Sequence, residues 1–370
     1  FIPRSSYDQV VEYIVKEIDD HKGKLAVDWA SFSERNGRFT LGAALAIKAR
    51  VLLYAASPLH NPDNDVEKWK KAAAAAYDII SNPDLNYSLD SDYGAYFQGN
   101  RSLSSPETIY VVRREQSNAM ESNNYPIATP GGASGVTPTQ NLVEAYEWVG
   151  DPVAGDPYAN RDPRLAASVV TNGSTWNGHV IDQSPGGRHD MSAPNASKTG
   201  YYLKKFLTDN LDLTQGAKVQ HNWVSYRYAE VLLNYAEAMN EAYGPDQAPG
   251  DYALTALDAL QLVRDRASLQ LPIVTAATRD EFREAVKHER RIELAFEDHR
   301  YWDLLRWKDA MEVLNKPVRG VKITKTGEGK WSYTQTEVAT RTFLERNYYM
   351  PFTRSEVENS NHTLEQNPGY

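Results

Sequence analysis

The sequence of 370 residues contains no cysteine, and this absence excludes several kinds of chemistry. Without thiols there is no disulfide bond, no thiolate ligand for zinc and no cysteine nucleophile. The chain also lacks an excess of basic residues, since 40 Lys and Arg stand against 49 Asp and Glu and give a formal net charge of −9. A nucleic-acid partner needs a basic face to offset phosphate repulsion, so we expect no such partner.

Long apolar runs are also missing, so no segment of the sequence is expected to span a bilayer. The sequence begins at Phe1 with no methionine and no targeting segment, which we interpret as a processed or partial product. Aromatic residues, in contrast, are abundant, with 23 Tyr, 9 Phe and 8 Trp. Surfaces rich in tyrosine and tryptophan suit flat amphipathic ligands or a protein interface.

Helical periodicity is found on both sides of a loop-rich middle. Apolar residues recur at i, i+3 and i+4 spacing, with Thr40 as a candidate N-cap and a loop at Asn36–Gly37 between the first two helices. The second and third helices are rich in alanine, so we expect them to form a close antiparallel pair of tetratricopeptide-like type. On this basis helices are expected over residues 7–18, 41–57, 65–81, 224–242 and 251–267, the last two forming a second such pair.

The middle and the end of the chain follow other patterns. Gly, Pro, Asn and Ser cluster repeatedly between residues 86 and 220, where exposed loops are the usual place for binding residues. Short strands are expected over 109–113 and 167–171, and a short helix near 139–147. A long helical stretch over 279–314 is expected to break near Asp298–His299. Alternating residues then predict a hairpin of strands over 318–326 and 331–338 around Gly327–Gly329.

The most densely charged stretch extends from His288 to Trp307. Glu289, Glu293 and Glu297 share one helix face, where Arg290 and Arg300 are within reach. Neighbouring arginines lower a carboxyl pKa, whereas a general acid needs the opposite shift. We therefore predict a structural network and assign no catalytic residue. Replacing Arg300 is expected to destabilise the protein by leaving Glu297 or Asp303 unpaired.

The loop from 172 to 202 is the best ligand-binding candidate in the sequence. An indole face stacks on the apolar face of a sugar ring, while arginine, histidine and asparagine hydrogen-bond its hydroxyl groups. The alternative is that Trp176 packs on the scaffold beneath its own loop, and both interpretations stay open. The candidate ligand-binding residues are Trp176, His179, Arg188, His189 and Tyr201, with Trp148 as a weaker one.

Motifs for cofactors and metals are absent or poorly spaced. No Gly-x-Ser-x-Gly, phosphate-binding loop or His-Glu-x-x-His motif occurs in the sequence. The polar loop containing His179, Asp182, His189 and Asp190 matches no known metal spacing. The segment 61–65 lacks the glycine and glutamate of a helix–loop–helix calcium site. We expect no cofactor and no metal.

The order of these landmarks resembles that of the SusD/RagB family of Bacteroidetes nutrient-binding outer-membrane lipoproteins. Each matching segment is modest alone, but their order over essentially the whole chain is specific. The matching segments are Gly37–Ala44, Ala49–Tyr54, Pro138–Tyr146, Asn160–Arg164, Gly200–Phe206, Tyr226–Ala238, Glu289–Arg306, Met350–Phe352 and Gln366–Tyr370.

The resemblance implies an all-α fold of tetratricopeptide-like helical pairs, with a loop-rich insertion and a small β-hairpin near the C-terminus. It also implies one domain over 1–370. Its parts would be a helical repeat part over 1–85, a loop-rich ligand-facing part over 86–220, a second helical part over 221–316, and a hairpin and tail over 317–370.

The function that the resemblance implies is non-catalytic. Such proteins are lipid-anchored on the cell surface and deliver oligosaccharides, or peptides in some relatives, to a SusC-like TonB-dependent transporter. Phe1 would align about a third of the way into full-length members, so the lipid anchor would lie outside this sequence. An α-helical glycoside hydrolase and a plain helical-repeat scaffold are the alternatives from other classes.

Overall fold

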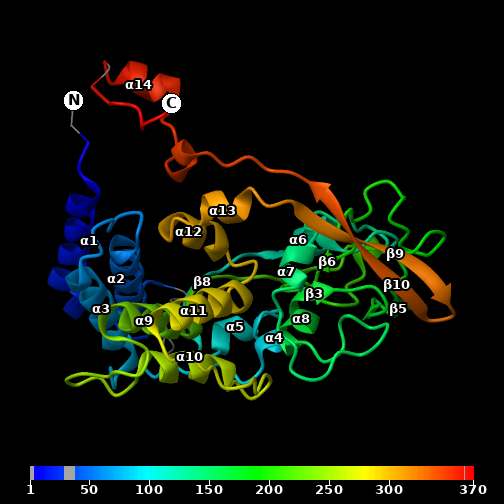
Figure 1. Ribbon diagram of the computed structural model, residues 1–370, viewed down its shortest axis with the longest axis horizontal. Coiled ribbons are helices and arrows are strands. Elements are labelled where there is room, and N and C mark those ends of the chain that lie inside the picture. The colour runs from blue at the N-terminus through cyan, green and yellow to red at the C-terminus, as the bar shows by residue number, and fades with distance from the viewer. Residues whose placement is uncertain (1–3, 29–37, 362) are drawn as a thin grey trace.

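A computed structural model gives the fold and describes residues 4–28, 38–361 and 363–370. The predicted loop at Asn36–Gly37 lies outside these residues. A helical half and a loop-rich half lie side by side, and a long β-hairpin projects along the loop-rich half (Figure 1). Helix is the main regular structure, in agreement with the expected fold class. None of the helices in the described part is both long and apolar enough to cross a membrane.

Alanine-rich helices build the first half. Thr40 caps α2 by accepting a hydrogen bond from the Ala43 amide at 3.2 Å, and Asp65 caps α3 in the same way. Small side chains let α2, α3 and α9 approach closely, and their buried alanines and leucines form the largest apolar core. The helices of this half are α1 (Tyr7–His21), α2 (Leu41–Ala56), α3 (Val66–Ile80), α9 (Tyr228–Tyr243), α10 (Ala256–Arg264) and α11 (Arg279–Glu293).

The start of α9 differs from the predicted helix over 224–242. Residues Trp223–Arg227 form strand β8, which pairs antiparallel with β1 (Thr108–Val112). Aromatic and β-branched residues at 223–226 favour a strand once a partner is available. The chain therefore changes from strand to helix at Arg227, and this change places the Arg227 side chain in the centre of the molecule.

The predicted break in the long helical stretch is confirmed. Helix α11 ends at Glu293, and α12 (His299–Arg306) and α13 (Ala310–Leu314) follow. Phe296 and Asp298 have φ values of +66° and +63°, a left-handed conformation that ends a helix and turns the chain. The turn sends α12 back over the helical half (Figure 1), where the Leu59 amide donates a hydrogen bond of 3.0 Å to the Arg306 carbonyl at the end of α12.

Short elements and long connections make up the loop-rich half. The predicted hairpin is present as β9 (Val318–Gly327) and β10 (Lys330–Ala339), which pair antiparallel. At Gly320 a Cβ atom would lie 2.7 Å from the Thr199 Cα, so glycine allows β9 to approach the loop beneath it. The other elements of this half are α4 (Tyr93–Tyr96), α5 (Arg101–Ser104), β2 (Gln116–Ser117), α6 (Ala119–Asn124), α7 (Gln140–Val143), α8 (Pro163–Ser168), β3 (Val169–Val170), β4 (Thr175–Trp176), β5 (His179–Val180), β6 (Tyr202–Leu203) and β7 (Val219–Gln220).

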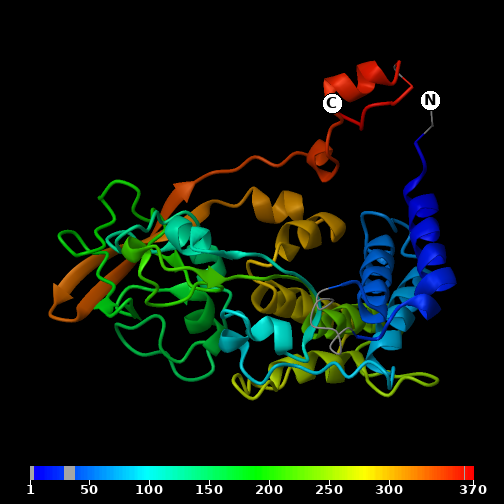
Figure 2. The ribbon, with the colours of Figure 1, turned by 180° about the vertical axis from the view of Figure 1, so that it is seen from behind.

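The two ends of the described chain meet. Helix α14 (Arg354–Asn359) and the last residues lie on the same side of the molecule as α1 (Figure 2). The Arg4 guanidinium donates a hydrogen bond of 2.9 Å to the Asn367 side chain and lies over the Phe352 ring. This contact joins the C-terminal segment to the start of the helical half.

Candidate functional site

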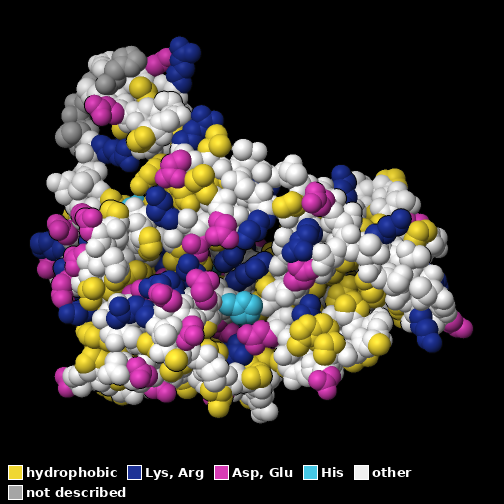
Figure 3. Space-filling model, viewed as in Figure 1, with side chains coloured by type: hydrophobic (Ala, Val, Ile, Leu, Met, Phe, Trp, Pro, Cys, Tyr) yellow, Lys and Arg dark blue, Asp and Glu magenta, His cyan; other side chains and the backbone are white. Residues whose placement is uncertain are grey.

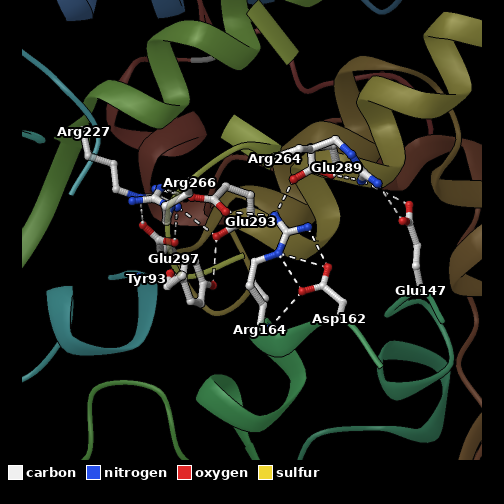
Figure 4. Close-up of polar contacts among 12 residues, drawn as sticks. Tyr93, Glu147, Asp162, Arg164, Arg227, Arg264, Arg266, Glu289, Glu293 and Glu297 are labelled. Atoms are coloured by element: carbon white, nitrogen blue, oxygen red, sulfur yellow. Dashed lines mark hydrogen bonds and ion pairs between the residues drawn. The ribbon is translucent and has the colours of Figure 1, made fainter. Parts of the chain in front are cut away.

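A buried network of ion pairs joins the helical half to the loop-rich half (Figure 4). At its centre Arg227 is 2% exposed and donates hydrogen bonds of 2.7 Å to each of Glu107, Glu293 and Glu297. Lys205 contributes a second basic group, with its ammonium 2.7 Å from Glu297. Every one of these charges is paired, which is the condition for burying charge in a protein.

Three more arginines extend this network from other segments. Arg266, two residues after the end of α10, bridges Glu107 at 2.6 Å and Glu293 at 2.9 Å. Arg164 of α8 contacts Glu293 at 2.9 Å and also binds Glu289. Arg264 donates a hydrogen bond of 2.8 Å to the second carboxylate oxygen of Glu289. The acidic face of α11 is thus neutralised by arginines that lie far from it in the sequence.

The predicted structural network is therefore confirmed, but its predicted partners are wrong. Arg290 turns away from the glutamates and binds Asp303 of α12 at 3.0 Å. Arg300 forms no ion pair within residues 4–28, 38–361 and 363–370, because Glu297 and Asp303 already have other partners. The predicted destabilisation by an Arg300 substitution is accordingly withdrawn.

These carboxylates are unsuited to acid catalysis. Burial by itself raises the pKa of both Glu293 and Glu297. The arginines around Glu293, and Arg227 with Lys205 beside Glu297, outweigh this effect and hold both pKa values below the ordinary range. A group held as a fixed anion among three or four donors has neither a proton to give nor room for a substrate. The network has the properties of a scaffold element.

Acidification should expose the contribution of the paired carboxylates. Burial raises the pKa of Glu230, but Arg50 at 2.6 Å and His299 outweigh it and lower this pKa to about 2. A depressed pKa contributes stability that is complete above about pH 4.5 and is lost as the pH falls toward 2. We expect Glu230 alone to account for about 3 kcal/mol of unfolding free energy over this interval, measured by urea unfolding at several pH values.

The Glu230→Gln variant provides the control for this measurement. It lacks the titrating group, so its loss of stability between pH 4.5 and pH 2 should be smaller than that of the parent protein. Equal losses in the two proteins would show that the Arg50–Glu230 pair does not contribute to acid sensitivity.

The burial of Trp176 corrects its prediction as a ligand-stacking residue. Its side chain is 2% exposed and contacts the Tyr125 ring edge-to-face at a centroid distance of 5.7 Å. The Asn177–Gly178 turn between β4 and β5 has positive φ at both residues, which is typical of a two-residue hairpin. That hairpin directs Trp176 into an apolar cluster with Ile181, so the packing alternative is the one observed.

Two further candidates are also buried. His189 is 2% exposed, and burial together with neighbouring Arg188 lowers its pKa to about 4. Tyr201 is 1% exposed and hydrogen-bonds Gln140, while Tyr158 donates to its hydroxyl at 3.3 Å. Neither side chain presents a surface to a ligand, because the surrounding segments cover both.

The remaining three candidates are accessible, and each has different contacts. Trp148 is 39% exposed, and the Arg161 guanidinium lies 4.2 Å from its ring centroid. His179 is exposed in the β4–β5 hairpin. Arg188 is exposed and donates a hydrogen bond of 3.3 Å to the Ala128 carbonyl. These three residues stay predictions.

Sequence reasoning missed a groove between α7, α12, α13 and the start of β9. Its volume is about 450 Å³. Basic side chains gather near the middle of the face that contains it, between α13 and α7 (Figure 3). We call it the basic groove, and its charged lining consists of Arg291, Arg300, Lys316, Arg319, Arg341 and the single carboxylate Glu144. No sequence signal pointed to it, because these residues come from four separate segments.

The geometry defines a helical scaffold that carries a loop-rich surface, and comparison with known proteins agrees with this architecture. The SusD family profile matches residues 96–370, and the chain belongs to this family. It is 25% identical over 351 residues to SusD-like protein P38 of Formosa agariphila, covering 86% of this chain and 61% of that protein. The chain spans about three fifths of the length of the curated relatives that it matches first.

Solved structures show the same architecture. A SusD-like protein of Bacteroides fragilis is 26% identical and has a TM-score of 0.80, covering all of this chain and 72% of that one. A SusD-like carbohydrate-binding protein of the same species is also 26% identical and has a TM-score of 0.79, with coverages of 96% and 71%. The family predicted from the landmark segments is thereby confirmed.

Proposed function

We propose that the protein is a non-catalytic cell-surface protein that captures oligosaccharides and delivers them to a SusC-like TonB-dependent transporter. The observation that carries this proposal is membership of the SusD family together with a whole-chain structural match to a SusD-like carbohydrate-binding protein. The paired carboxylates of α11 support a binding role, since none is available for glycosidic bond cleavage.

The proposal extends to organisation and location. We propose that the α2–α3 and α9–α10 pairs are tetratricopeptide-like and that the chain is a single domain of four parts, over 1–85, 86–220, 221–316 and 317–370. The loop-rich part would face the ligand, with Trp148, His179 and Arg188 as contacts. The protein would be held at the outer membrane by a lipid anchor outside this sequence, with no cofactor and no metal.

A glycan panel with product analysis tests this function. We expect calorimetric titration to detect binding of at least one oligosaccharide, and long incubation to release no reducing ends. Release of reducing ends that a single Asp or Glu substitution abolishes would instead establish a glycoside hydrolase. Binding confined to peptides would assign the protein to the peptide-binding relatives.

A further inference from the structure

Two arginines that line the basic groove are not paired with any carboxylate of the described residues. Arg300 and Arg341 form neither an ion pair nor a hydrogen bond with any of the described residues, and Arg291 contacts only the Asn141 carbonyl. The carboxylates nearest to Arg300 are already engaged, since Asp303 binds Arg290 and Arg306, and Asp309 binds Lys287.

The electrostatics of Arg300 show that its charge is poorly compensated. Burial and then the neighbouring charge of Arg291 lower the pKa of Arg300 to about 10. Burial likewise lowers the pKa of Arg291. Half-buried guanidinium groups that repel one another raise the free energy of the unliganded protein, and an anion between them would remove that cost.

The groove also has the shape and the lining for a sugar ring. The partly exposed apolar side chains Leu142, Leu314 and Val318 lie between the basic ones and offer a surface to the apolar face of a ring. Guanidinium groups form paired, charge-assisted hydrogen bonds with carboxylate or sulfate oxygens. Positive charge is concentrated here although the whole chain carries −9, so the groove is a local exception to the charge of the protein.

We propose that the basic groove binds the carboxylate or sulfate-ester groups of acidic oligosaccharides, with Arg300, Arg291 and Arg341 as the anion-binding residues. This inference rests on the proposed glycan-binding function and specifies its substrate class. Lys316 and Arg319 line the same groove but are paired with Glu312 and Glu144, so they would contribute less.

Calorimetric titration of the purified 370-residue protein with matched probes tests the proposal. The probes are a polygalacturonate oligosaccharide and its carboxyl-reduced form, and a sulfated galactan oligosaccharide and its desulfated form. We expect at least one acidic probe to bind at least about tenfold more tightly than its neutral counterpart, with affinity falling as salt is raised. The two acidic probes distinguish a carboxylate ligand from a sulfate ligand.

Charge-removing variants locate the effect in the groove. Arg300→Gln should weaken binding of the acidic probe at least about tenfold without lowering the melting temperature, because Arg300 has no ion pair to lose. Arg354→Gln removes an arginine from exposed helix α14 and should bind like the parent protein. A lowered melting temperature with unchanged affinity would assign Arg300 a structural role and overturn the proposal.

The outcomes for the groove and for the general function are separable. Binding of neutral oligosaccharides with no preference for acidic forms would overturn the groove proposal and leave the proposed function intact. Preference for an acidic probe that is equal in the Arg300→Gln and Arg354→Gln variants would place the anion elsewhere and also overturn it. An absence of binding to all probes and to the wider glycan panel would count against both.

Discussion

Replacement of Arg227 by methionine is expected to lower the free energy of unfolding by about 3–5 kcal/mol. The substitution removes a side chain that contacts Glu107, Glu293 and Glu297 together. Methionine is close in volume, so the loss would come from carboxylates left buried beside fewer cations. Urea unfolding of the variant and the parent protein measures this difference.

The matched control is Arg354→Met. Arg354 pairs with Glu358 on the surface of α14, and its side chain is 92% exposed. Exposed ion pairs contribute at most about 1 kcal/mol, so this variant should unfold near the parent midpoint. Equal effects of the two substitutions would mean that the central network is no more important for stability than surface charge.

Replacement of Trp176 by alanine should cost about 3–5 kcal/mol of stability and leave oligosaccharide affinity unchanged. The substitution empties a position in the cluster of Tyr125, Ile181, Tyr202 and Leu203, and the surrounding loops can fill only part of the cavity. A melting curve and a calorimetric titration on the same purified variant measure both quantities.

Trp148→Ala is the informative comparison, because its ring is 39% exposed. It should change the free energy of unfolding by less than about 1 kcal/mol. If Trp176→Ala instead keeps the melting temperature of the parent protein and loses affinity, the Trp176 side chain would have to leave its apolar cluster when the ligand binds.

Local sequence signals predicted the regular elements well where both ends of an element carry a signal. The cap at Thr40 identified the start of α2, and the helices predicted over 41–57 and 65–81 differ from α2 and α3 by at most one residue at each end. The Gly-rich turn at 327–329 identified the β9–β10 hairpin for the same reason. At Arg227 the same reasoning failed, because pairing of β8 with the distant β1 replaces the first helical turn.

The candidate site could be predicted only in part. Residue type and loop position selected six side chains, but burial depends on segments far away in the sequence. Tyr125 covers Trp176, and Gln140 engages Tyr201, although neither contact leaves a local pattern. Trp148, His179 and Arg188 lie at the surface, as a ligand-binding role requires, and stay predictions for glycan contact.

The sequence by itself indicated the family, the position of the long helices apart from some of their ends, the hairpin and the neutralisation of the α11 carboxylates by arginine. The tertiary structure decided which arginines do so. Helical spacing places Arg290 and Arg300 within reach of the glutamates. The residues that bind these glutamates are instead Arg164, Arg227, Arg264 and Arg266, because a buried carboxylate pairs with the donors that tertiary packing brings next to it. Among the described residues Arg300 is left without an ion pair in the basic groove, where we propose that it binds an anionic ligand.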